Sequence, residues 1–159
     1  MSADKNWPRW IFASVSKSFE SKRDGVSFYV EGDSFDPSTV KSYFEFRMNG
    51  PSCWELPGNV WYFKFEVNIL VVHKRAENEN IHRLSDLIGI ATTMFERSIP
   101  IMKYGEGADD NREVLFDCAI LTNDDSDEPV SITQLGQVDP NFKEMQAMVE
   151  GTYKIYHEV

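Results

Sequence analysis

Histidine, cysteine and clustered carboxylates are the residues of this chain whose chemistry could support catalysis or metal binding. The three histidines His73, His82 and His157 show none of the spacings that bring imidazoles onto one metal ion. Cys53 and Cys118 form no C-x-x-C pair, and the sequence contains no G-x-S-x-G, Walker or H-E-x-x-H motif. We therefore expect a protein that is not an enzyme, with no catalytic residue, metal site or cofactor.

Two short stretches resemble ligand-binding loops but lack the residues that those loops need. Asp125-Ser126-Asp127 begins like a calcium loop, yet Pro129-Val130 replaces the required glycine and no bidentate glutamate follows. Gly105-Glu106-Gly107 resembles part of a nucleotide loop, but the carboxylates around it would repel phosphate and no lysine follows directly. Both stretches are therefore expected to be acidic turns.

Negative charge is concentrated in the last third of the chain. Residues 1–103 hold 13 acidic and 13 basic side chains, whereas residues 104–159 hold 13 acidic and 3 basic ones, so the net charge of −10 resides there. The acidic turns could simply keep the protein soluble. Alternatively, they face a lumen or a partner, where negative potential is felt over roughly 8–10 Å. The candidate residues for such a surface are Glu106, Asp109, Asp110, Asp124, Asp125, Asp127 and Glu128.

Length and composition favour one globular domain over residues 1–159. A chain of 159 residues with 42% hydrophobic and 13% aromatic residues is large enough for a core and too apolar for disorder. No apolar run approaches the roughly 20 residues needed to span a bilayer, and the polar start does not resemble a secretory signal. Two distant cysteines suit reduced thiols in a cytoplasm, and a pI near 4.7 argues against gripping nucleic acid by its phosphates.

Apolar spacing predicts a helix near the start of the chain. Asn6 is a plausible cap and Pro8 suits the first helical turn. Trp10 lies off the apolar stripe and is expected to be exposed, and Val26–Glu31 is strand-like. The residues of the stripe are Ile11, Val15 and Phe19.

The middle of the chain is predicted to be β-structure. Phe44–Met48 alternates between apolar and polar residues, and Asn49-Gly50-Pro51 is expected to separate that strand from a short one at Cys53–Leu56. The clearest strand runs over Trp61–His73, with apolar residues at the odd positions. At roughly 40 Å it would be twice a typical strand, so we expect it to curve or to project beyond the domain body.

Large apolar groups outside the expected core suggest contacts with other subunits. Tyr62 lies opposite the buried face of its strand, and exposed aromatic residues are favoured in protein–protein interfaces. A long strand of this kind fits a subunit that completes its sheet with a neighbour. Charge in the distal part of the strand, as in Val71→Asp, is expected to yield monomers. The candidate interface residues are Trp10, Tyr62, Leu70, Val71 and Val72.

The remaining elements predict the fold class. A second amphipathic helix, capped by Asn80, is expected to run to about Phe95. Strands follow at Val114–Leu121, buried on both faces, at Val130–Val138 and at Gln146–Val159. The order of elements predicts an α+β domain with two helices packed on one face of a mainly antiparallel sheet and one long projecting strand or hairpin.

Several stretches resemble neck proteins of tailed bacteriophages, and the order of elements is most similar to the tail terminator family. The resemblance covers most of the chain and carries no catalytic signature. The stretches are Trp7-Pro8-Arg9-Trp10-Ile11-Phe12, Phe44-Glu45-Phe46-Arg47-Met48-Asn49-Gly50-Pro51, His82-Arg83 followed by Leu87–Ala91, and Lys103-Tyr104-Gly105-Glu106-Gly107-Ala108-Asp109-Asp110.

The resemblance implies a structural protein of the virion neck, assembled in the cytoplasm of a bacterial host. Such a protein forms a homomeric ring, commonly of six subunits, that ends polymerisation of the tail tube. Its partners would be the tail tube protein and a head-side connector or adaptor ring, with no membrane. Double-stranded DNA would pass through the lumen without specific binding, and acidic residues there would repel its phosphates.

Three alternatives stay open from the residues alone. The chain could be another neck or head-tail connector protein, or an acidic DNA mimic that occupies the cleft of a basic protein. It could also be a small enzyme, which would require a deep pocket with convergent polar groups. Oligomeric mass separates these hypotheses, because a neck protein predicts a ring, whereas a DNA mimic predicts a monomer or dimer.

Overall fold

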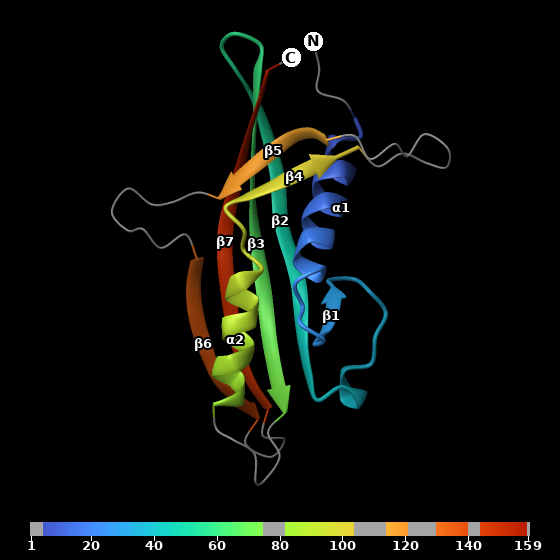
Figure 1. The fold of residues 1–159 in the computed structure, drawn as a ribbon, viewed down its shortest axis with the longest axis vertical. Helices are drawn as coiled ribbons and strands as arrows, with labels where there is room; N and C mark the ends of the chain where they lie inside the picture. The colour runs from blue at the N-terminus through green and yellow to red at the C-terminus, as the bar shows by residue number, and fades with distance from the viewer. Residues whose placement is uncertain (1–4, 75–81, 104–113, 121–129, 140–143, 159) are drawn as a thin grey trace.

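Three long strands form the centre of the fold. The computed structural model describes residues 5–74, 82–103, 114–120, 130–139 and 144–158. Strands β2 and β3 form a hairpin, and β7 pairs with β3 along its whole length (Figure 1). Each of these strands has 15 residues: β2 is Ser42–Leu56, β3 is Val60–Lys74 and β7 is Glu144–Glu158.

Four shorter strands extend the sheet on both sides. The order is β1-β2-β3-β7-β5-β4, and β6 pairs with β7 beside β5. The β1–β2 pair is parallel and the other pairs are antiparallel, which confirms the mainly antiparallel sheet. The shorter strands are β1 Ser27–Val30, β4 Ser98–Met102, β5 Val114–Ile120 and β6 Val130–Asp139.

Both helices pack on the same face of this sheet, as the sequence predicts. Helix α1 (Trp7–Glu20) packs against β4 and β2, and helix α2 (Arg83–Thr93) lies over β3 and β7 (Figure 1). The predicted stripe of α1 is confirmed, because each of its side chains has no exposed surface, and Asn6 occupies the N-cap position. The stripe residues are Ile11, Val15 and Phe19.

The core lies between the helices and the odd-numbered residues of β3. From Phe63 to Val71 these residues face the helices as their alternation predicts, and each has at most 2% of its surface exposed. Phe19 of α1 packs edge-on against Phe46, Phe95 and Tyr153, with ring centroids 5.4, 4.8 and 6.4 Å away. The buried residues of β3 on this face are Phe63, Phe65, Val67, Ile69 and Val71.

One predicted strand break is wrong. Residues 49–51 do not end a strand; β2 continues through them with a β-bulge between Asn49 and Ser52. Gly50 has φ +95°, a left-handed conformation that glycine adopts without steric cost. The bulge changes which residues face the helices: Phe46 does so before it, and Cys53, opposite Phe63, does so after it. Trp54 is thereby placed on the face without helices.

Three further expectations need correction or lie outside the described residues. The sequence pattern does not predict strand β4, because Pro100 within it is typical of a helix terminator. Strand β5 is buried on one face rather than two, since Cys118 is buried whereas Asp117 and Ala119 are exposed. The predicted cap Asn80 lies outside the described residues, and His82 precedes the first turn of α2.

Gly151 tests the packing of the core. A Cβ atom at this position would lie 2.8 Å from Cδ1 of Phe95 and 3.4 Å from Cδ1 of Ile120. We expect Gly151→Ala to lower the free energy of unfolding by about 1–3 kcal/mol, because the added methyl group would displace the Phe95 ring from its place in the core. Gly89→Ala on the exposed side of α2, with nothing within 4 Å, is the matched control and should raise it by about 0.5–1 kcal/mol. Urea unfolding of both variants checks this, and equal effects would contradict it.

Burial of the Cys118 thiol in the same core should make the stability of the protein depend on pH. Burial raises the pKa of this thiol from 9.0 to about 12. The folded pKa lies above the unfolded one, so its contribution to stability is complete below about pH 9 and is lost as the pH rises toward 12. We expect the urea midpoint to fall with pH above 9 in the wild type, and to fall less steeply in Cys118→Ala. Parallel curves for the two proteins would contradict this assignment.

Candidate functional site

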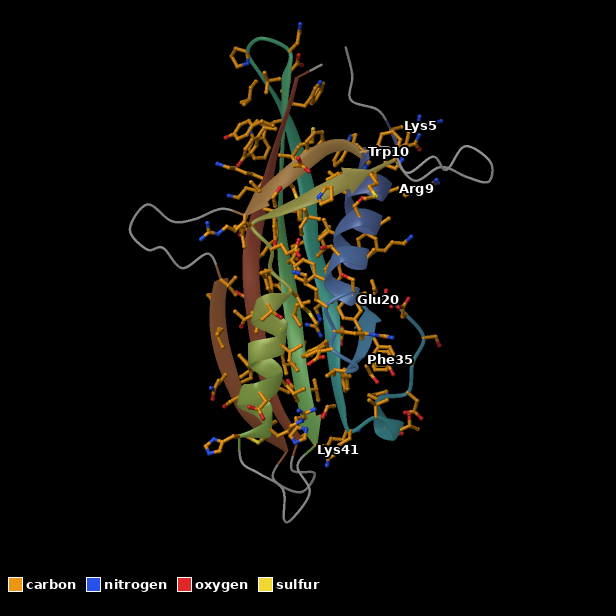
Figure 2. The ribbon with its side chains drawn as sticks, in the orientation of Figure 1. Lys5, Arg9, Trp10, Glu20, Phe35 and Lys41 are labelled. Carbon is orange, nitrogen blue, oxygen red and sulfur yellow. The ribbon has the colours of Figure 1, made fainter. Side chains whose placement is uncertain are left out.

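Four of the five predicted interface residues are buried inside the protomer. Trp10 and Leu70 each have 7% of their surface exposed, and Val71 and Val72 have none. The expectation that Trp10 is exposed is wrong, because its side chain belongs to the main core (Figure 2). Val71 faces the helices, so Val71→Asp would place a charge in the core and unfold the subunit rather than separate subunits.

Leu70 and Val72 face away from the helices, yet a loop covers them. They pack with Tyr43 and Met148 beneath the segment that follows β1. In that segment the ring of Phe35 stacks on the ring of Tyr29 with centroids 3.8 Å apart. This end of the sheet is therefore closed by the chain itself.

A short 3-10 turn, η1 (Pro37–Thr39), holds that covering loop. Asp36 precedes the turn, and its Oδ1 accepts hydrogen bonds from the Ser38 hydroxyl at 2.6 Å and the Ser38 amide at 3.0 Å. These bonds lower the pKa of the Asp36 carboxyl. The Lys74 ammonium donates to the Pro37 carbonyl, which joins the loop to the end of β3.

The middle of the helix-free face is polar. Arg47 Nε donates to Glu45 Oε1 at 3.0 Å along β2. Asn68, which lies between Arg47 of β2 and Glu150 of β7 in the strand register, is 7% exposed, and its Oδ1 has no hydrogen-bond partner among the residues that the structure describes. This band is therefore no apolar docking surface.

The opposite end of the sheet carries an exposed aromatic row. The β2–β3 hairpin and the end of β7 extend beyond the helices and beyond β4 and β5 (Figure 1). There Trp54, Tyr62 and Tyr156 are neighbours across three strands, with centroids 4.4 Å and 4.8 Å apart. Trp54 is 42% exposed and Tyr156 is 57% exposed. We call these three residues the aromatic row.

A nearby cation and a protonated hydroxyl define the chemistry of the aromatic row. Lys154 Nζ lies 5.5 Å from the centroid of the Tyr156 ring, within range of a cation–π interaction. Burial, and then the neighbouring Tyr156, raise the pKa of Tyr62, so its hydroxyl is protonated at neutral pH. The row is thus an exposed aromatic surface with a cation beside it, and aromatic residues are enriched in protein interfaces.

Of this row, the sequence predicts only Tyr62 as an interface residue. Tyr156 shares the polar face of its strand with Glu150 and Lys154, so alternation along that strand is consistent with its exposure, but alternation does not show that it lies beside Tyr62. For Trp54 the bulge at Gly50 reverses the alternation. Recognising the three residues as one row requires the cross-strand pairing with Tyr62, and therefore the registers of β2 and β7 on β3.

The candidate acidic surface lies outside the described residues, so its position stays a prediction. The residues concerned are Glu106, Asp109, Asp110, Asp124, Asp125, Asp127 and Glu128.

Two observations on the described part of the chain concern metal and substrate binding. Its histidines, cysteines and carboxylates form no group of three that could hold a metal ion. A shallow depression lies at the carboxyl end of α1, lined by charged side chains such as Lys17, Glu20 and Arg23. It is open to solvent rather than enclosed, unlike the deep pockets that small substrates occupy. Neither described helix has the length and apolar character that crossing a membrane requires.

Comparison with known proteins adds no assignment. No family model matches the chain, and no curated protein matches it. The resemblance to phage neck proteins therefore rests on the sequence stretches quoted above.

Proposed function

We propose that this chain is a structural subunit of the neck of a tailed bacteriophage, of the tail terminator type. In this proposal identical subunits, six by the family resemblance, form a closed ring at the head-proximal end of the tail tube. The ring ends tube polymerisation, contacts the head-side connector and surrounds the DNA. It acts in the virion by binding alone and catalyses no reaction.

The observation that carries this proposal is the aromatic row at the projecting end of the sheet. A subunit that acts alone gains nothing from leaving Trp54 and Tyr156 in water beyond its helices, since burying each would be worth about 1.5–3 kcal/mol. Aromatic residues of this kind are enriched among the residues that dominate binding energy at interfaces. An end-on position suits contact with a second ring or with the end of a tube.

The charge of the chain is compatible with the same proposal. The net charge of −10 would keep a ring from gripping the phosphates of DNA during passage. Another neck or connector protein would share these features and is the closest alternative. An acidic DNA mimic is the second alternative, and it differs in requiring no assembly.

Oligomeric mass is the first test of this proposal. We expect the purified chain to run as a ring of about six 18.3 kDa subunits in light scattering, with an annulus in negative-stain images. Binding to tail tubes of the same phage should occur at tube ends and not to free tube subunits. A monomer at high concentration, with no effect on tube length, would contradict the proposal.

The aromatic row is the second test. We expect Trp54→Ala with Tyr156→Ala to weaken binding to tube ends about 30-fold or more, because interface aromatics commonly contribute 2 kcal/mol or more. The pair Trp54→Phe with Tyr156→Phe keeps the apolar rings and is the matched control, with a loss below about 5-fold. Ring mass and thermal stability should be unchanged in both pairs. Full binding by the double alanine variant would contradict this role for the row.

A further inference from the structure

Two lysines lie next to the aromatic row on the helix-free face of the sheet. Lys64 follows Tyr62 by two residues on β3, so the two side chains share a face of the strand. Lys154 precedes Tyr156 by two residues on β7 and shares its face in the same way. The register of β3 on β7 places Lys64 directly opposite Lys154. We call these two residues the lysine pair, and it forms one continuous surface with the aromatic row.

The lysine pair is not neutralised within the described part of the subunit. Lys64 is exposed, and the ion pairs of the described residues do not include either lysine. Lys154 instead lies near the ring of Tyr156. Glu66 follows Lys64 on the same face, but no ion pair joins it to the lysine pair. Like charges that are directly opposite on neighbouring strands destabilise a sheet, so this arrangement has a cost in the isolated subunit.

Charge complementarity indicates what a partner must bring to this surface. Any partner that buries the aromatic row also covers the lysine pair, because the two are adjacent on one face. An ammonium that loses water without gaining an anion is costly, so the partner has to supply negative charge. Arg47 on the same face shows how the chain neutralises a cation itself, since its Nε donates to Glu45 Oε1 at 3.0 Å.

The geometry of the row favours carboxylates of a protein over phosphates of a nucleic acid. Proteins that bind single strands use a positively charged groove and aromatic rings on which successive bases stack. Here neighbouring rings pack on one another, tilted by 51° and 54° with centroids 4.4 Å and 4.8 Å apart, so no base fits between them. A net charge of −10 also repels a run of phosphates at long range. Two lysines beside apolar rings match a few carboxylates beside apolar side chains.

We propose that the aromatic row and the lysine pair together bind a protein surface on which Asp or Glu side chains lie beside apolar side chains. The rings of the row pack against the apolar groups, and the ammonium groups of Lys64 and Lys154 pair with the carboxylates. This inference rests on the proposed contact of the row with the tube end, and it adds the charge that the partner carries there.

Charge reversal tests the lysine pair while leaving the aromatic row intact. We expect Lys64→Glu with Lys154→Glu to weaken binding to tail tube ends about 30-fold or more, because attraction becomes repulsion. The pair Lys64→Gln with Lys154→Gln removes only the attraction and should weaken binding about 5–10-fold. Raising the salt concentration should weaken binding of the wild type more than binding of this glutamine pair.

The matched control is Lys17→Glu with Lys41→Glu, which changes the net charge by the same amount. Both lysines are exposed and distant from the row, Lys17 on α1 and Lys41 at the opposite end of the sheet (Figure 2). Screening over such a distance should keep the loss of binding below about 2-fold. Circular dichroism and ring mass verify that every variant folds and assembles.

Zero-length cross-linking identifies the anion directly. A carbodiimide joins an amine to a carboxylate only where the two are in contact. In the complex of the wild type with tail tubes, we expect mass spectrometry to find cross-links from Lys64 or Lys154 to Asp or Glu residues of the tube protein. Nuclease treatment of the same complex should leave binding unchanged.

Two results would overturn the inference while leaving the proposed function in place. One is a charge-reversed protein that binds tube ends as well as the wild type does, although Trp54→Ala with Tyr156→Ala does not. The other is a set of cross-links that joins the lysine pair only to a second copy of the chain. Binding that nuclease abolishes would also overturn it, by making a nucleic acid the occupant. A wild type that does not bind tube ends would overturn the proposed function together with this inference.

Discussion

The burial of one face of β3 is the constraint on which the rest of the structure depends. Phe63, Phe65 and the three aliphatic residues that follow at odd positions are removed from water by both helices and by β7. Burying five such side chains is worth on the order of 10 kcal/mol, comparable with the whole stability of a domain this size. Both helices are thereby committed to one face of the sheet.

The helix-free face of the sheet is covered to different extents along the length of the strands. At one end the loop after β1 covers Leu70 and Val72 with Phe35, and in the middle a polar band lies across the strands. At the far end the strands extend beyond every described covering element, and the aromatic row is left in water. Apolar side chains of the helix-free face are therefore buried at one end of the sheet and exposed at the other, where we propose that the subunit contacts its partners.

The same contrast applies to the edges of the sheet. Ser14 of α1 occupies the Met102 amide of β4, and Asp33 occupies the Val30 amide of β1, whereas β6 has no such cap among the described residues. Natural proteins protect long apolar edges, so an edge without protection suggests that its protection is another molecule.

The amino-acid sequence by itself determined the α+β class, the first helix and the buried face of β3, because each depends on local periodicity that a single element expresses. It did not determine which apolar residues stay exposed. Trp10 is buried because α1 is covered on more than its stripe, and Trp54 is exposed because the bulge at Gly50 reverses the alternation of β2. Whether a side chain meets water depends on what other elements cover it, and only the tertiary structure decides that.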